Sequence, residues 1–90
     1  MKVFRIYTES TGHMRANAIS AVSEDFESFT VIDCEGYWED ARESSIIIEI
    51  IADDNYTTSL TVKAAARRIR DANYQQCVLV TAADVDGTFV

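Results

Sequence analysis

The side chains suited to acid–base chemistry gather at one turn near the start of the chain. His13, the only histidine, follows Glu9 and Ser10 by a few residues. Imidazole titrates near neutral pH, and an adjacent carboxylate can act with it as an acid–base pair. A nucleophilic triad is defined by its geometry and by an oxyanion site, and the spacing shows neither. We therefore predict no catalytic residue, and we expect His13 to lie in a solvated loop.

Two acidic turns offer oxygen ligands for a hard cation. Their residues are Asp53, Asp54, Asp84 and Asp86. The spacing does not match a calcium-binding EF-hand loop, and a single histidine cannot supply an imidazole cluster. The sequence therefore predicts neither a bound metal nor a cofactor.

A basic stripe recurs at helical spacing in the second half of the chain. Lys63, Arg67 and Arg70 lie at positions i, i+4 and i+7. Because guanidinium groups bind oxyanions in a bidentate way, we predict Arg67 and Arg70 as contacts to a small anionic ligand. The alternative is a solvated helix face that balances acidic neighbours and the helix dipole.

The composition limits the class of protein. The chain has 90 residues, 48% of them hydrophobic and 26% charged, with a net charge of −7. These values predict a single globular domain over residues 1–90. An acidic chain repels phosphate backbones, and no apolar stretch is long enough to span a bilayer, so we expect no nucleic-acid or membrane partner and a cytoplasmic location. Cys34 and Cys77 are expected to be free, buried thiols.

The hydrophobic periodicity predicts six elements. Strands are expected over residues 3–9, 29–34, 45–51 and 77–82. The first helix is expected over residues 14–26. The second is expected to follow N-cap candidates in residues 53–59, with an apolar stripe from Val62 to Ala72. Both crossover connections must be right-handed, which places both helices on one side of the sheet. The predicted fold is an α+β, ferredoxin-like βαββαβ sandwich, with an antiparallel sheet in the order 4-1-3-2.

The sheet face without helices is the predicted interface. In the 4-1-3-2 order, Arg5 and Glu49 lie on adjacent strands and can form an ion pair. Tyr7, Ile47 and Ile51 share this face, which is more apolar than a solvated sheet surface usually is. We interpret the face as a homo-oligomer interface oriented by the ion pair. The alternative is an ordinary mixed face exposed to solvent.

The hairpin tip, expected over residues 36–44, carries two adjacent aromatic residues. Gly36 is expected to form a bulge or bend before Tyr37 and Trp38. Aromatic side chains beside a turn either stabilise the hairpin or contact a ligand or protein partner. We predict Tyr37 and Trp38 as ligand contacts under the second interpretation.

The hairpin resembles the central hairpin of CutA-type proteins. The aromatic pair, the charged turn and the acidic Glu43 before the apolar strand carry this resemblance. CutA and PII signalling proteins are ferredoxin-like trimers, so the resemblance implies sheets that face a trimer centre and ligands in clefts between subunits. The chain departs from both: CutA proteins follow this strand with a Lys-Thr pair, and PII proteins carry a longer loop. A separate small family of this fold, encoded by a phage or another mobile element, fits as well.

These observations favour a homo-oligomeric binding module, expected to be a trimer, over an enzyme. Its partner would be a small ligand or a protein. Two alternatives stay open. One is a small enzyme with an active site between subunits, using His13 and Glu9. The other is a phage-type inhibitor that sequesters a basic host factor.

Overall fold

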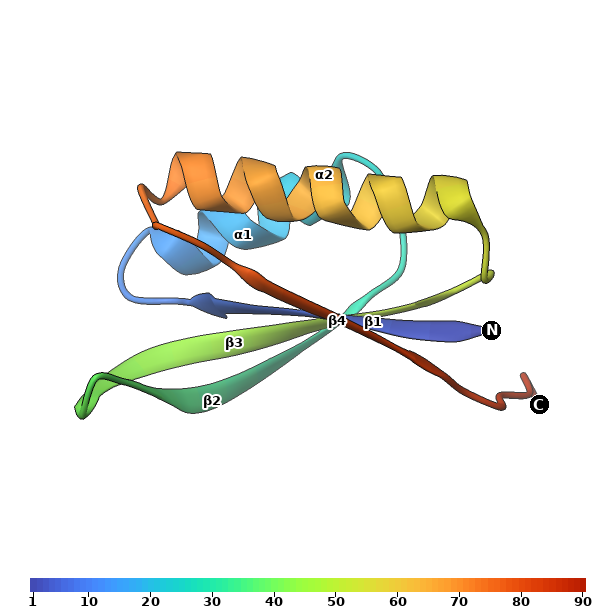
Figure 1. The fold of residues 1–90 in the computed structure, drawn as a ribbon, viewed down its shortest axis with the longest axis horizontal. Coiled ribbons are helices and arrows are strands. Elements are labelled where there is room, and N and C mark those ends of the chain that lie inside the picture. The colour runs from blue at the N-terminus through green and yellow to red at the C-terminus, as the bar shows by residue number, and fades with distance from the viewer.

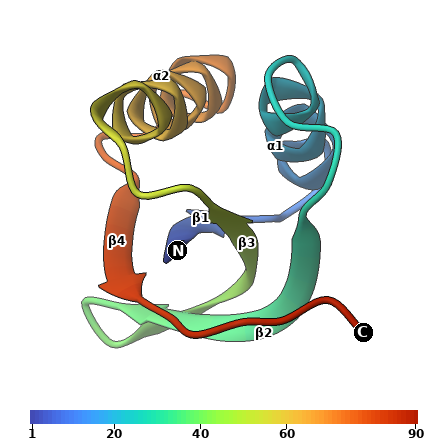
Figure 2. The same cartoon turned by 90° about the vertical axis from the view of Figure 1, so that its right-hand side faces the viewer.

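The fold consists of one four-stranded sheet with two helices packed on one of its faces (Figures 1 and 2). A computed structural model describes all residues from Met1 to Val90. The elements are β1 (Lys2–Glu9), α1 (Met14–Ser23), β2 (Thr30–Trp38), β3 (Ala41–Ala52), α2 (Tyr56–Ala72) and β4 (Leu79–Asp84). The sheet order is β2-β3-β1-β4, with every pair antiparallel. The predicted ferredoxin-like fold is confirmed. No helix is long and apolar enough to cross a membrane.

The core lies between the sheet and the two helices. β1 and β3 alternate strictly, so every second side chain points toward the helices. The buried apolar side chains are Phe4 and Ile6 of β1, Ile46, Ile48 and Ile50 of β3, Ala18, Ala21 and Val22 of α1, and Val62, Ala65, Ala66 and Ile69 of α2. Small alanines on both helices allow a close approach to the sheet.

Some element boundaries differ from the prediction. α1 ends at Ser23, and Phe26 reaches the core from the following loop. β4 begins at Leu79 rather than at residue 77. At the end of α2, Asn73 forms the C-cap as predicted. Periodicity alone misplaces these ends because a loop residue can also bury its side chain.

The predicted hairpin tip of residues 36–44 is wrong. β2 and β3 stay paired up to Trp38 and Ala41, so the turn consists of only Glu39 and Asp40. These two residues have φ values of 49° and 67°. Positive φ at both positions matches the twist of a two-residue hairpin, although Asn-Gly or Asp-Gly is the usual sequence there. Because the pair Glu39-Asp40 is unusual in such a turn, the sequence did not indicate a two-residue turn here.

Gly36 is a regular strand residue rather than the predicted bulge. It pairs with Glu43 in the antiparallel ladder. A Cβ atom at this position would lie 2.5 Å from Oγ of Ser45. The glycine therefore leaves room for the Ser45 hydroxyl group next to β2.

Gly36→Ala should destabilise the fold by about 1 kcal/mol, because the added methyl group displaces the Ser45 hydroxyl group from its position. Urea denaturation would measure this change as a lower midpoint at an unchanged slope. The double variant Gly36→Ala/Ser45→Gly should recover part of the loss. An unchanged midpoint for the single variant would show that the close approach does not constrain this position.

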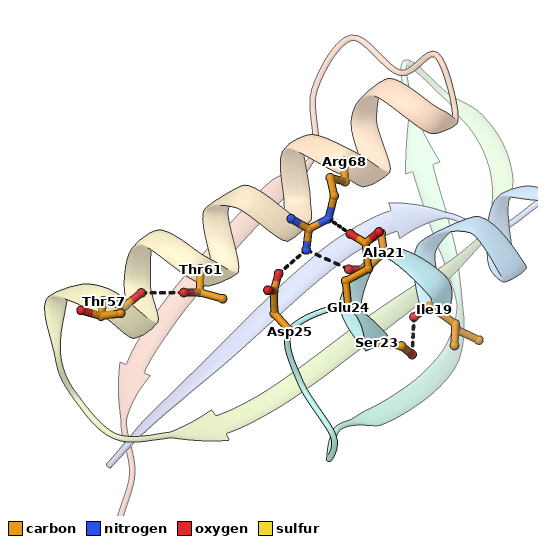
Figure 3. A network of polar contacts seen from close by, with 8 residues as sticks. All are labelled: Ile19, Ala21, Ser23, Glu24, Asp25, Thr57, Thr61 and Arg68. Carbon is orange, nitrogen blue, oxygen red and sulfur yellow. Dashed lines mark hydrogen bonds and ion pairs between the residues drawn. The ribbon is translucent and has the colours of Figure 1, made fainter.

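Arg68 of α2 joins the two helices (Figure 3). Its Nη2 donates a hydrogen bond to the carbonyl oxygen of Ala21 at 2.9 Å and pairs with Asp25. Its Nε lies 2.5 Å from Oε2 of Glu24, without the angle of a hydrogen bond. Arg68 thus holds the end of α1 against α2, a structural role that separates it from the neighbouring basic residues.

Candidate functional site

The sheet face without helices is hollow and apolar. Figure 2 shows β4 running away from the helices on one side of the sheet, while β2 runs away from them on the other side and curves underneath. The side chains of Ile32, Trp38, Ile51 and Leu79 lie on this face and are 41%, 60%, 51% and 59% exposed. So much exposed apolar area on one face is typical of a binding or assembly surface.

The predicted ion pair crosses one half of this face. Arg5 pairs with Glu49 in the β1–β3 register, and Nε of Arg5 donates to Oε2 of Glu49 at 2.9 Å. This hydrogen bond raises the pKa of Arg5. The Arg5 and Glu49 side chains are 47% and 22% exposed, so the pair is only partly covered in a single chain. Tyr7, opposite Ile47, lies further along the same face.

The other half of the face, next to the hairpin, contains a cavity of about 430 Å³. We call this the hairpin cavity. Its lining comes from β1, β2, β3 and the segment before β4, and includes Tyr7, Glu9, Cys34, Trp38, Glu43, Ile47, Gln75, Cys77 and Leu79. A second cavity of about 230 Å³ adjoins it and shares Glu9, Trp38, Glu43, Gln75 and Cys77. No lysine or arginine lines either cavity.

A pair of carboxyl groups lies where the two cavities meet. Glu9 is opposite Ser45, and Glu43 is the next residue on the same face of β3, so the two are diagonal neighbours. A hydrogen bond with the Glu9 carboxyl raises the pKa of Glu43, and burial and the charge of Glu9 raise it further. A raised pKa means that Glu43 keeps its proton to a higher pH than an isolated glutamate does, and a bound cation would favour its ionised form.

The loop from Asn73 to Val78 forms one wall of these cavities, and the core holds it in place. Oγ1 of the buried Thr8 donates to Oε1 of Gln75 at 2.7 Å. The backbone N–H of Gln75 donates to the Arg70 carbonyl at 2.9 Å. Nδ2 of Asn73 donates to the Met14 carbonyl at 3.1 Å. These bonds fix the loop between β1 and both helices, which makes the wall preorganised.

Tyr37 and Trp38 point to opposite faces of β2. The hydroxyl of Tyr37 donates to Oε2 of Glu35 at 3.3 Å, and Glu35 also pairs with Arg42 at 3.0 Å. Arg42 lowers the pKa of Glu35 below its usual range. Tyr37 thus belongs to a polar cluster that stabilises the hairpin, although it also borders the hairpin cavity. Trp38 lines both cavities and is the better ligand contact.

The remaining predicted residues fall into two other places. His13 and Glu9 line a shallow groove of about 470 Å³ between the start of α1 and the end of α2. Arg67 and Arg70 line a pocket beside β4 that contains no aromatic residue. The structure therefore does not bring the predicted arginines together with Tyr37 and Trp38 at one site.

The prediction of buried thiols is wrong. Cys34 is half-buried and Cys77 is exposed, and both are free. They lie on β2 and beside β4, the two edges of the sheet, yet both line the hairpin cavity. The sheet bends, so both of its edges face one hollow, and the two thiols reach this cavity rather than the core.

The sequence interpretation missed Glu43, Gln75 and Gln76 as site residues. The signal for Glu43 was present, because the alternation of β3 places it on the same face as Glu9. No sequence pattern indicated Gln75 or Gln76 as site residues. Their place in the cavity wall depends on the path by which the loop returns to the sheet, which the sequence does not show.

Comparison with solved structures places this geometry among known folds. The chain is similar to a phage SAM lyase in complex with S-methyl-5′-thioadenosine, with a TM-score of 0.76, 14% identity, and coverage of 92% of this chain and 80% of that one. It is similar to a phage SAM lyase in the apo state, with a TM-score of 0.73, 16% identity, and coverage of 91% and 78%. It is also similar to CPII, a nitrogen regulatory PII-like protein from Thiomonas intermedia K12 bound to ADP, AMP and bicarbonate, with a TM-score of 0.65, 14% identity, and coverage of 99% and 94%.

Because all three sequence identities are low, these similarities show the fold alone. The chain thus resembles PII-like ferredoxin-fold proteins, as the sequence interpretation expected, and the resemblance to CutA stays a prediction. No family model and no curated protein sequence matches the chain.

Proposed function

We propose that this protein binds S-adenosylmethionine in the hairpin cavity and cleaves it, releasing S-methyl-5′-thioadenosine. The observation that carries the proposal is the Glu9–Glu43 carboxyl pair, which lies beside Trp38 in a cavity without a basic residue. The fold similarity to phage SAM lyases, one of them with S-methyl-5′-thioadenosine bound, supports it.

The charge of the cavity favours a cationic nucleoside over a nucleotide. S-adenosylmethionine carries a positive sulfonium and a positive ammonium group, both of which a carboxyl pair attracts. The face of Trp38 can stack on adenine or contact the sulfonium. A polyphosphate would instead meet Glu9 and Glu43 with no cation among the lining residues. The volume of about 430 Å³ is within the range of small-molecule sites.

The proposed reaction requires the protein mainly to position the substrate. The carboxylate oxygen of the substrate itself would attack the γ-carbon of the aminobutyrate chain as the bond from that carbon to sulfur breaks. This forms homoserine lactone, which keeps the ammonium charge, while sulfur keeps the bonding electrons and leaves as the neutral thioether of S-methyl-5′-thioadenosine, so no acid is needed. Glu9 and Glu43 would hold the cationic groups, and the apolar walls would limit access of water. Correct orientation in a desolvated cavity supplies a large part of many rate enhancements.

The same sheet face supports assembly into a homo-oligomer, and we propose a trimer. Tyr7 and Ile47 extend from the hairpin cavity toward the Arg5–Glu49 pair, and Ile51 lies beyond it. A second copy packed over the Arg5–Glu49 half would bury that pair and bring its own surface to the rim of the cavity. The ligand would then lie at the boundary between two subunits.

A second candidate is a PII-like module that binds the same nucleoside without cleaving it. The fold similarity to CPII favours this possibility. This module would use the same cavity, and it would differ from the proposed enzyme only in releasing the ligand uncleaved.

Incubation of purified protein with S-adenosylmethionine, followed by mass spectrometry, separates the two candidates. The proposed enzyme should release S-methyl-5′-thioadenosine well above the spontaneous rate of a protein-free sample. Saturable binding without product would support the binding module. Neither binding nor product would contradict both.

A further inference from the structure

A basic groove lies on the other side of the loop that walls the hairpin cavity. It runs between α2 and β4, with Lys63, Arg67 and Arg70 on the helix side and Val78 and Val80 on the strand side. Its volume is about 210 Å³. The hairpin cavity is lined by acidic residues, so the two sites have opposite charge although both reach Cys77.

Two of the three cations in this groove lack an acidic partner, which is unusual in this chain. The chain contains eight lysines and arginines against fifteen acidic residues. Six of the eight basic residues form ion pairs within 4.0 Å, and only Lys63 and Arg67 form none. Arg70 pairs through Nε with the adjacent Asp71 at 3.0 Å, which leaves its terminal nitrogens free for other contacts.

The arrangement of these cations fits a tetrahedral oxyanion. Positions i, i+4 and i+7 share one face of α2, so the three charges converge on one groove. Arginine binds phosphate with two parallel hydrogen bonds, and lysine adds a point charge. The volume of about 210 Å³ lies below the roughly 300 Å³ of typical small-molecule sites, so it suits a single phosphate group rather than a whole nucleotide.

We propose that the α2–β4 groove is a phosphate-binding site, with Lys63 and Arg67 as principal ligands and Arg70 as a third contact. The phosphate would be free inorganic phosphate or the phosphate group of an ester whose remainder lies outside the groove. The site does not depend on the function proposed for the hairpin cavity.

Amide NMR of the full chain, titrated with inorganic phosphate at constant ionic strength, tests this proposal. Saturable shifts are expected along Lys63–Arg70 and at Cys77 and Val78. Arg67→Gln and Lys63→Gln should each weaken phosphate binding about tenfold. The matched control is Arg15→Gln, which removes the same charge from α1, where Arg15 pairs with Asp33. The control should bind phosphate as the wild type does.

A parallel titration with adenosine 5′-monophosphate separates the two sources of phosphate. Equal affinities support a site for free phosphate, and tighter monophosphate binding supports an ester. Three outcomes overturn the proposal: shifts that never saturate, an equal loss in Arg15→Gln, or no phosphate binding combined with a smaller assembly of Arg67→Gln in native mass spectrometry. The last would make the groove a contact between copies. Arg67→Gln should bind S-adenosylmethionine as the wild type does. The test of the phosphate site is therefore independent of the test of the hairpin cavity.

Discussion

Glu43→Gln is expected to weaken binding of a cationic nucleoside by about 10- to 100-fold. Glutamine keeps the size of the side chain but removes the charge that contacts the ligand, and a hydrogen bond to a charged group contributes roughly 1.5–3 kcal/mol. Formation of S-methyl-5′-thioadenosine should fall by at least the same factor. The matched control is Glu27→Gln, at an exposed acidic residue remote from the cavity. Equal activity in Glu43→Gln and wild type would remove Glu43 from the site.

As pH rises through the titration of Glu43, ligand affinity should rise and the stability of the fold should fall. The pKa of Glu43 is raised in the folded chain, so the folded state holds its proton at pH values where the unfolded chain has released it. Glu43 therefore lowers stability as pH rises through this range, whereas ligand affinity rises because the ionised pair attracts a cation. At neutral pH, Glu43→Gln should raise stability by about 0.5 kcal/mol, the scale of a cross-strand pair of like charges. A less stable variant would mean that its binding defect reflects misfolding.

Arg5→Glu should dissociate the oligomer, raising its dissociation constant at least about 100-fold. The substitution places two acidic side chains opposite each other, at Arg5 and Glu49, on the face proposed to be buried between subunits. Removing one partner of a buried ion pair costs about 3–5 kcal/mol. Native mass spectrometry and light scattering across micromolar concentrations would show smaller species.

The charge swap Arg5→Glu/Glu49→Arg should restore assembly, because it recreates the pair with reversed polarity. Arg15→Glu, which breaks the exposed pair with Asp33, should leave the oligomer intact. A wild-type protein that stays monomeric at every concentration would contradict the interface.

Much of the fold could be predicted because its signals are local. Strict alternation in β3, with Ile46, Ile48 and Ile50 on one face, identifies a half-buried strand. The handedness of the crossover connections then fixes the helix-covered face, and 4-1-3-2 is the usual strand order of a βαββαβ domain. The Arg5–Glu49 pair followed from the same register, and the structure confirms its geometry.

The site could be predicted only in part, because it depends on curvature and on a loop. The alternation of strands says nothing about how far a sheet bends, so the hollow around Trp38 and the shared cavity of Cys34 and Cys77 were not visible. The two-residue turn at Glu39 and Asp40 lacks the glycine that usually marks it. Gln75 joins the site through a hydrogen bond to Thr8, 67 residues away in the chain.

The most direct test of the central claim compares three ligands by calorimetry. Sinefungin carries a protonated amine in place of the sulfonium and has no bond between carbon and sulfur to break; S-adenosylhomocysteine lacks this charge, and ADP carries negative charge instead. The carboxyl pair predicts that sinefungin binds at least about tenfold more tightly than S-adenosylhomocysteine, a difference of roughly 1.4 kcal/mol, and that ADP does not bind in the hairpin cavity. In Glu43→Gln, we expect sinefungin and S-adenosylhomocysteine to bind with similar affinities. Equal affinities for sinefungin and S-adenosylhomocysteine, or a preference for ADP that survives in Arg67→Gln, would contradict the account.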